Sequence, residues 1–128
     1  MSAKKRFLLI DDSKSIHAFV REAVSPLGFE MVSVFDGAQG VAKIQADKNF
    51  DFILLDWEMP VMDGPTTLKE LVKMVPHIPI SMITSKNSFE NLKEMITIGA
   101  KEYIMKPFTK DIFLEKIQTL CPVETKVS

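Results

Sequence analysis

The chain has 128 residues, of which 46% are hydrophobic and 26% charged, a composition typical of one soluble globular domain with a single core. Sixteen Lys and Arg residues nearly balance 17 Asp and Glu residues, which argues against binding to nucleic acid or to an anionic membrane. The single cysteine, Cys121, excludes an intramolecular disulfide. With no signal-peptide pattern and no apolar run near the ~20 residues of a membrane span, we expect a cytoplasmic protein.

The first 35 residues predict a strand, a helix and a second strand. Phe7–Ile10 is continuously apolar, as is typical of a central parallel strand covered by helices on both faces. Apolar residues then recur at helical spacing over 16–27, and Gly28 stands where a left-handed C-terminal residue belongs. His17 lies between the apolar positions of this helix, so we expect it in solvent. Met31–Phe35 includes a polar residue and suits a more exposed strand.

The middle of the chain predicts a second helix, a third strand and a third helix. The second helix, which has a less regular pattern, is expected over 38–47. Phe52–Leu55 is again continuously apolar and predicts another central strand. Pro65, directly after Gly64, suits the first position of a helix that continues until Pro76.

The last two strands are predicted at Ile80–Ile83 and Tyr103–Met105, and a helical pattern follows each of them. The first of these helices is closed by Gly99, and the second is capped by Thr109. Five alternating strands and helices, (βα)5, predict an α/β fold with a doubly wound, five-stranded parallel sheet. We expect one domain over residues 1–128, with a core of about 6–120 and no effector domain after Pro122.

Polar residues follow four of the predicted strands. Asp11 and Asp12 follow the first strand, Asp56 ends the third, Thr84 the fourth and Lys106 the fifth. The carboxyl ends of parallel strands share one edge of the sheet, where ligands bind. If the first and third strands are neighbours, three carboxylates converge there and repel one another. A hard cation such as Mg²⁺ relieves that repulsion, and Lys106 adds a second positive charge.

This set of residues favours phosphoryl transfer, with Asp56 as a nucleophile that forms an aspartyl phosphate. Each residue alone has an ordinary structural interpretation. Asp12 or Ser13 can merely cap the first helix, Thr84 can simply end a strand, and Lys106 can be a surface charge. Their conjunction at one sheet edge is what indicates a site.

The motifs as a set resemble the response-regulator receiver family of two-component signalling over about Arg6 to Leu120. The matching segments are Asp11-Asp12, Asp56 with Met59-Pro60 and Asp63-Gly64, Thr84-Ser85, Gly99-Ala100 and Lys106-Pro107-Phe108. The Asp-Trp-x-Met-Pro run and the Lys-Pro-Phe-Thr segment are especially similar to the single-domain chemotaxis regulators of that family. The resemblance implies a flavodoxin-like fold with strand order 2-1-3-4-5.

The resemblance also implies the chemistry. Asp56 would accept a phosphoryl group from the phosphohistidine of a histidine kinase, with Mg²⁺ as the cofactor. Asp12, Asp56 and the backbone carbonyl of Glu58 would hold the metal, and Asp11 would contribute through water. Thr84 would hydrogen-bond one phosphoryl oxygen. Lys106 would pair with another.

Further roles follow from the same resemblance. Tyr103 would be an aromatic switch that moves inward when Thr84 is drawn toward the phosphoryl group, and the Lys106–Pro107 bond would be cis. The face formed by the fourth helix, fifth strand and fifth helix would bind the output protein, with a flagellar motor component as one candidate. We expect a monomer that catalyses only its own phosphorylation and dephosphorylation and is not otherwise an enzyme.

Glu58 and Lys86 occupy positions that vary in the family, and here they carry opposite charges. Each lies two residues beyond a site residue, so both are expected to project over the mouth of the site. We expect them to set the lifetime of the phosphoryl group together. The alternative is an exposed ion pair that contributes only ~0–1 kcal/mol to stability.

Three other interpretations stay open at this point. The chain could be a receiver excised from a multidomain response regulator or a hybrid kinase. A metal-dependent aspartyl-phosphate hydrolase of the haloacid-dehalogenase type needs a second acid two residues after the nucleophile followed by Thr, and Glu58-Met59-Pro60 does not continue that way. A flavodoxin-like cofactor binder needs an anion-friendly loop where Asp11-Asp12 stands.

Overall fold

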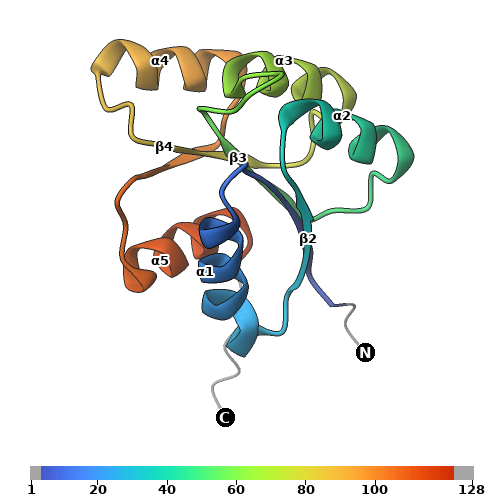
Figure 1. Cartoon of the computed structure of the whole chain (residues 1–128), viewed down its shortest axis with the longest axis vertical. Helices are drawn as coiled ribbons and strands as arrows, with labels where there is room; N and C mark the ends of the chain where they lie inside the picture. The colour runs from blue at the N-terminus through green and yellow to red at the C-terminus, as the bar shows by residue number, and fades with distance from the viewer. Residues whose placement is uncertain (1–3, 123–128) are drawn as a thin grey trace.

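The computed structural model describes residues 4–122 and shows a parallel sheet between two layers of helices (Figure 1). The strands are β1 (Arg6–Ile10), β2 (Glu30–Val34), β3 (Phe52–Asp56), β4 (Ile80–Thr84) and β5 (Glu102–Met105). The helices are α1 (Lys14–Val24), α2 (Gly37–Ala46), α3 (Gly64–Met74), α4 (Phe89–Ile98) and α5 (Lys110–Leu120), with a short 3-10 turn η1 (Ser25–Leu27) after α1. The predicted fold class is confirmed. The chain after Pro122 lies outside the described residues.

The strand order is β2-β1-β3-β4-β5, and every neighbouring pair is parallel. Helices α1 and α5 cover one face of the sheet, whereas α2, α3 and α4 cover the other (Figure 1). The chain winds outward from β1 to β2 and then returns to β3 on the other side of β1. The reversal therefore places the carboxyl ends of β1 and β3 side by side, where such folds bind ligands. No helix within residues 4–122 has the length and apolar character needed to cross a membrane.

The two central strands are apolar because both of their faces are covered. Phe7 of β1 packs with the α1 and α5 layer, whereas Leu8 faces the opposite layer, and the alternation continues along the strand. The rings of Phe7 and Phe52, which are paired residues of β1 and β3, stack with centroids 4.7 Å apart. The edge strand β2 is only partly buried, as its mixed sequence predicted.

Each helix begins with a side-chain cap in the loop that follows a strand. The capping residues, whose side chains accept a hydrogen bond from a backbone N–H in the first turn, are Ser13, Asp36, Asp63, Ser88 and Thr109. These caps fix where each helix begins at the carboxyl edge of the sheet. Because Ser13 is the cap of α1, Asp12 is not needed for that purpose.

The first helix ends earlier than the apolar spacing predicted. Helix α1 stops at Val24, and η1 follows because Pro26 has no N–H to continue the helical hydrogen bonding. Gly28 then adopts the expected left-handed conformation, with φ 73°. Leu27 is consequently 38% exposed, although its spacing had placed it with the buried residues.

This difference predicts unequal effects of two Leu→Ala substitutions on the free energy of unfolding in urea. Leu71→Ala removes a side chain with no exposed surface and should cost ~2–5 kcal/mol. Leu27→Ala should cost no more than ~1.5 kcal/mol, because over a third of that side chain is already in water. Equal losses would contradict the placement of Leu27.

Candidate functional site

Three carboxylates converge at the carboxyl ends of β1 and β3. Asp11, Asp12 and Asp56 each present an oxygen atom, and these atoms all lie within 4.8 Å of one another. Asp56 is the last residue of β3, whereas Asp11 and Asp12 directly follow β1. Asp11 is fully buried and Asp56 is 3% exposed, but Asp12 is exposed. The grouping predicted from the strand pattern is therefore present.

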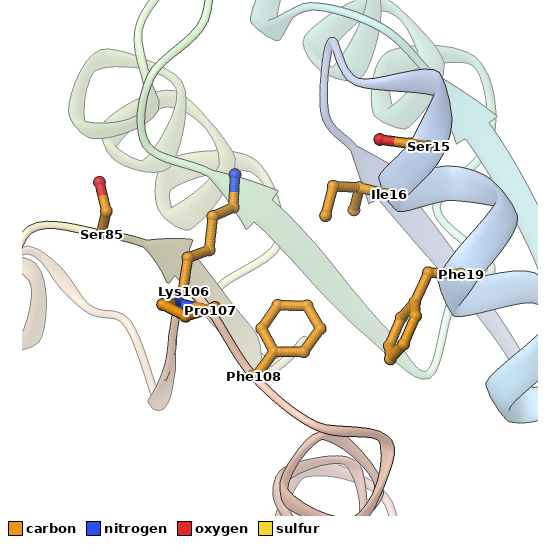
Figure 2. A pocket seen from close by; sticks show the side chains of 7 residues that line it. All are labelled: Ser15, Ile16, Phe19, Ser85, Lys106, Pro107 and Phe108. Atoms are coloured by element: carbon orange, nitrogen blue, oxygen red, sulfur yellow. The ribbon is translucent and has the colours of Figure 1, made fainter.

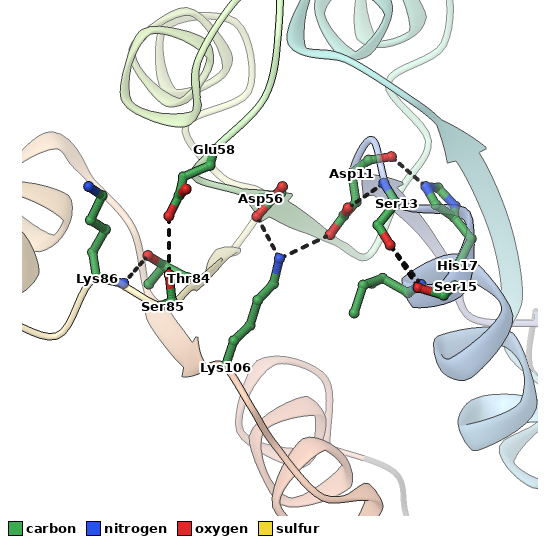
Figure 3. A network of polar contacts seen from close by, with 11 residues as sticks. Asp11, Ser13, Ser15, His17, Asp56, Glu58, Thr84, Ser85, Lys86 and Lys106 are labelled. Atoms are coloured by element: carbon green, nitrogen blue, oxygen red, sulfur yellow. Dashed lines mark hydrogen bonds and ion pairs between the residues drawn. The ribbon is translucent and has the colours of Figure 1, made fainter.

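The side chain of Lys106 reaches this cluster from the far side of β4. Its Nζ lies 3.0 Å from Asp56 Oδ1 and 3.9 Å from Asp11 Oδ2 (Figure 3). The Lys106 backbone N–H donates to the Thr84 carbonyl at 2.8 Å, which extends the β4–β5 pairing by one residue. The Lys106–Pro107 bond that follows is cis. One ammonium group thus lies against two buried carboxylates.

The electrostatics of the cluster are unfavourable for ionised acids. Burial and, after it, the negative charge of Asp11 raise the pKa of Asp56 to about 6, even though Lys106 opposes both effects. Burial likewise raises the pKa of Asp11, which the Ser13 N–H and Lys106 oppose. A single lysine therefore does not fully compensate the charge of these two groups.

The residues present fit a magnesium ion. Asp11 Oδ1 accepts a hydrogen bond from the Ser13 N–H at 2.8 Å, but Oδ2 is buried and has no hydrogen-bond partner among the described residues. The Lys106 contact with Oδ2, at 3.9 Å, is an ion pair too long for a hydrogen bond. Unsatisfied buried oxygens are rare. Together with Asp12 and Asp56 this atom forms a set of oxygen ligands, the type that Mg²⁺ prefers.

Thr84, at the end of β4, is buried, and its Oγ1 accepts a hydrogen bond from the Lys86 backbone N–H at 2.8 Å. The next residue, Ser85, donates from its hydroxyl to Glu58 Oε1 at 3.1 Å (Figure 3). Within residues 4–122, Glu58 forms no ion pair with Lys86. The Glu58 carboxylate is thus held by Ser85, which the sequence placed in a family motif but to which it gave no role.

Tyr103 lies on the same face of the sheet as Thr84. Thr84 pairs with Met105, and side chains two residues apart in a strand share a face. The half-buried Tyr103 ring packs with the core on the α4 side, and Lys116 Nζ lies 5.1 Å from its centroid. The position of Tyr103 is therefore compatible with the switch role that the resemblance implied.

The expectation that His17 is solvated was wrong. Its side chain is 3% exposed, because this part of α1 faces the edge strand β2. His17 Nε2 lies 2.7 Å from the Asp11 carbonyl oxygen (Figure 3). On the other side of the ring, Nδ1 lies 2.8 Å from Ser33 Oγ. Burial lowers the pKa of His17, which favours the neutral ring. The apolar spacing of α1 gave no signal for this contact.

A hollow of about 550 Å³ adjoins the site between the start of α1 and the loop after β5 (Figure 2). Ile16 and Phe19 line one side, and Lys106, Pro107 and Phe108 line the other. Its walls are mainly apolar, and the Phe19 and Phe108 rings meet edge to face at 5.4 Å. The acid cluster is therefore bordered by an apolar surface on the α1 side.

Comparison with known proteins is consistent with this arrangement. Residues 7–118 match the family described as the response regulator receiver domain. Chemotaxis protein CheY-3 of Vibrio cholerae is 29% identical over 122 residues, which is 94% of each protein. The structure of CheY4 from Vibrio cholerae is 32% identical with a TM-score of 0.85, over 92% of this chain and 99% of that one.

A third relative is known in a complex. The structure of a CheX–CheY–BeF3–Mg²⁺ complex from Borrelia burgdorferi is 26% identical to this chain with a TM-score of 0.86. The similarity covers 91% of this chain and 88% of that one. The family match, the strand order and the grouping of acids with Lys106 lead to one conclusion: this chain belongs to the response-regulator receiver family of two-component systems, and it is CheY-like.

Proposed function

We propose that the chain is a phosphorylation-controlled signalling domain whose Asp56 accepts a phosphoryl group from the phosphohistidine of a histidine kinase. The observation that carries the proposal is the position of Asp56. It ends a rigid, fully covered strand, has Lys106 Nζ 3.0 Å from Oδ1, and lies beside two further acids. A buried carboxylate in such surroundings is suited to nucleophilic attack.

In the proposed transfer, a carboxylate oxygen of Asp56 attacks the phosphorus atom of the donor. The new bond is an aspartyl acyl phosphate, and the phosphorus–nitrogen bond breaks. Its electron pair stays on the imidazole, which takes up a proton. Lys106 lies close enough to Asp56 to pair with a phosphoryl oxygen. The Thr84 hydroxyl accepts from Lys86, so its own proton can be donated to another phosphoryl oxygen.

Asp11, Asp12, Asp56 and the Glu58 backbone carbonyl are the groups that would hold Mg²⁺. The bound cation would supply charge neutralisation for the phosphoryl oxygens, as in phosphoryl transfer generally. Support for this assignment comes from the unpartnered Asp11 Oδ2, and from the Glu58 carbonyl, which accepts no backbone hydrogen bond among the described residues. The magnesium in the Borrelia burgdorferi CheY complex supports it as well.

The output is proposed to be a protein contact on the face of α4, β5 and α5. Ile96 of α4 and Ile112 of α5 are about half exposed. Tyr103 of β5 packs on the α4 side of the sheet, the face that also carries Thr84. Movement of Tyr103 would couple Thr84 to this face. The chemotaxis relatives make a flagellar motor component one candidate target. We propose that the domain acts as a cytoplasmic monomer, either alone or as a receiver within a longer protein, and turns over no other substrate.

Phosphorylation should occur only at Asp56. With Mg²⁺ and acetyl phosphate, the intact mass should rise by one phosphoryl group, and Asp56→Asn should abolish the increase. Asp111→Asn, which changes an exposed acid in the first turn of α5, serves as the matched control and should be labelled like the parent. Equal labelling of Asp56→Asn would overturn the assignment, and rapid turnover of p-nitrophenyl phosphate would favour a hydrolase.

Mg²⁺ should stabilise the fold, because it relieves repulsion among the clustered acids. At ten times the dissociation constant, linkage adds ~1.4 kcal/mol to the free energy of unfolding. Trp57, half-buried next to Asp56, should report binding through its fluorescence. Asp12→Asn removes an exposed ligand and should weaken both responses. A melting temperature and a Trp57 signal that are both indifferent to millimolar Mg²⁺ would contradict a metal site here.

Glu58 and Lys86 are proposed to set the lifetime of the phosphoryl group together. The Glu58 carboxylate repels a phosphoryl dianion and the Lys86 ammonium attracts it, so each should alter the effect of the other even without a direct ion pair. Autodephosphorylation rates of Glu58→Ala, Lys86→Ala and the double variant form the test. We expect a coupling above ~0.5 kcal/mol in the activation free energy. Strictly additive effects would show two independent surface charges.

A further inference from the structure

The buried histidine of α1 joins three segments of the chain that meet beside the acid cluster. His17 extends from the first turns of α1 toward the end of β2 and the loop after β1 (Figure 3). It contacts Ser33 on one side and the Asp11 backbone on the other, at 2.8 and 2.7 Å. The Phe35 ring lies against its imidazole, with the two centroids 4.3 Å apart. None of these groups takes part in the proposed phosphoryl transfer.

The hydrogen bonds define which nitrogen of His17 carries the proton. A carbonyl oxygen can only accept, so Nε2 must donate to the Asp11 carbonyl. In the neutral ring Nδ1 is then the acceptor, and the Ser33 hydroxyl donates to it. Ser33 pairs with Leu9 in the β1–β2 register, which puts its side chain on the α1 face of the sheet. The tautomer and the ring orientation are thus set by the fold.

The contact with His17 completes the anchoring of the Asp11 backbone. The Asp11 N–H donates to the Val34 carbonyl at 3.2 Å, and the Asp11 carbonyl accepts from His17. The Asp11 carbonyl and the Asp12 nitrogen belong to the same peptide unit. The orientation of this carbonyl therefore determines the orientation of the Asp12 backbone. The exposed Asp12 side chain has no hydrogen bond or ion pair of its own within residues 4–122. Its place in the cluster therefore depends on this peptide unit.

We infer that His17 is a positioning residue for metal binding: by donating to the Asp11 carbonyl, it holds Asp11 and Asp12 in the arrangement that binds Mg²⁺. The inference rests on the proposed function, because it assumes that the acid cluster takes up the cation. Groups that orient metal ligands through hydrogen bonds typically change affinity by ~10–100-fold when they are removed. A purely structural role, in which His17 only packs α1 against β2, would instead change stability and leave affinity unaltered.

Titration of Mg²⁺ by Trp57 fluorescence and by calorimetry distinguishes the two roles. His17→Phe keeps a planar ring against Phe35 but loses both hydrogen bonds, and it should raise the dissociation constant about tenfold or more. His17→Gln retains an N–H donor and should recover most of that loss. Val24→Ala is the matched control, because it destabilises the same helix at a buried position away from Asp11. Its dissociation constant should stay within about twofold of the parent value.

Each outcome of this experiment decides the inference. Equal losses of affinity in Val24→Ala and His17→Phe, or a His17→Phe affinity within twofold of the parent, would overturn it. If His17→Phe does not fold, the ¹⁵N NMR spectrum of the parent provides a second test. Protonation at Nε2 is required, and a neutral ring protonated at Nδ1 refutes the assigned contact. A parent chain that binds no Mg²⁺ refutes the proposed function itself, whereas unchanged variants of a binding parent refute only the role of His17.

Discussion

Repulsion between two buried carboxylates is the constraint on which this site depends. Asp56 ends β3, and Asp11 directly follows the neighbouring strand β1. The pKa of each is raised mainly by burial, and the charge of Asp11 adds to the shift at Asp56 whereas the charge of Asp12 adds to the shift at Asp11. Lys106 opposes this repulsion from the end of β5 but leaves Asp11 Oδ2 without a hydrogen bond. The arrangement becomes favourable when additional positive charge arrives. A divalent cation would supply this positive charge, and the same cation would neutralise the oxygens of a phosphoryl group bound beside it.

The scaffold holds these charges together through rigid, apolar strands and through loops that end in helix caps. Phe52–Leu55 is buried on both sides, so Asp56 cannot relax away from its neighbours without disturbing the centre of the sheet. The start of α3 adds a further restriction, because a Cβ atom on Gly64 would meet the Trp57 Cα at 2.5 Å. Glycine is required there for the helix to approach the end of β3 this closely. Strand burial, helix capping and close backbone packing together make the carboxyl edge of the sheet rigid.

Much of this arrangement could be predicted from the sequence, since strong patterns encode it. The continuous apolar runs predicted the central strands, and strand-end polar residues predicted the cluster of Asp11, Asp12 and Asp56 with Lys106. Single side-chain contacts between distant segments carry no such pattern. Whether His17 lies in solvent depends on where β2 packs against α1, and that is decided by the tertiary structure.

Two further features of the structure have different origins. The contact of Ser85 with Glu58, rather than a pairing of Glu58 with Lys86, depends on the course of the loops after β3 and β4. The early end of α1 follows from Pro26, a local signal that the prediction from apolar spacing left out of account. Periodicity thus predicts elements and their faces well. A helix break such as the one at Pro26 can be read from a single local residue, whereas polar contacts between loops need the assembled fold.

The most direct test of the central claim is to locate the acyl phosphate chemically. Borohydride reduces an aspartyl phosphate to homoserine, and peptide sequencing by mass spectrometry then identifies the position in the chain. If Asp56 is the carboxylate made reactive by its neighbours, homoserine should appear at position 56 and nowhere else, and only when Mg²⁺ and a phosphodonor are both present. Homoserine at position 11 or 12, or equal conversion without Mg²⁺, would contradict the account.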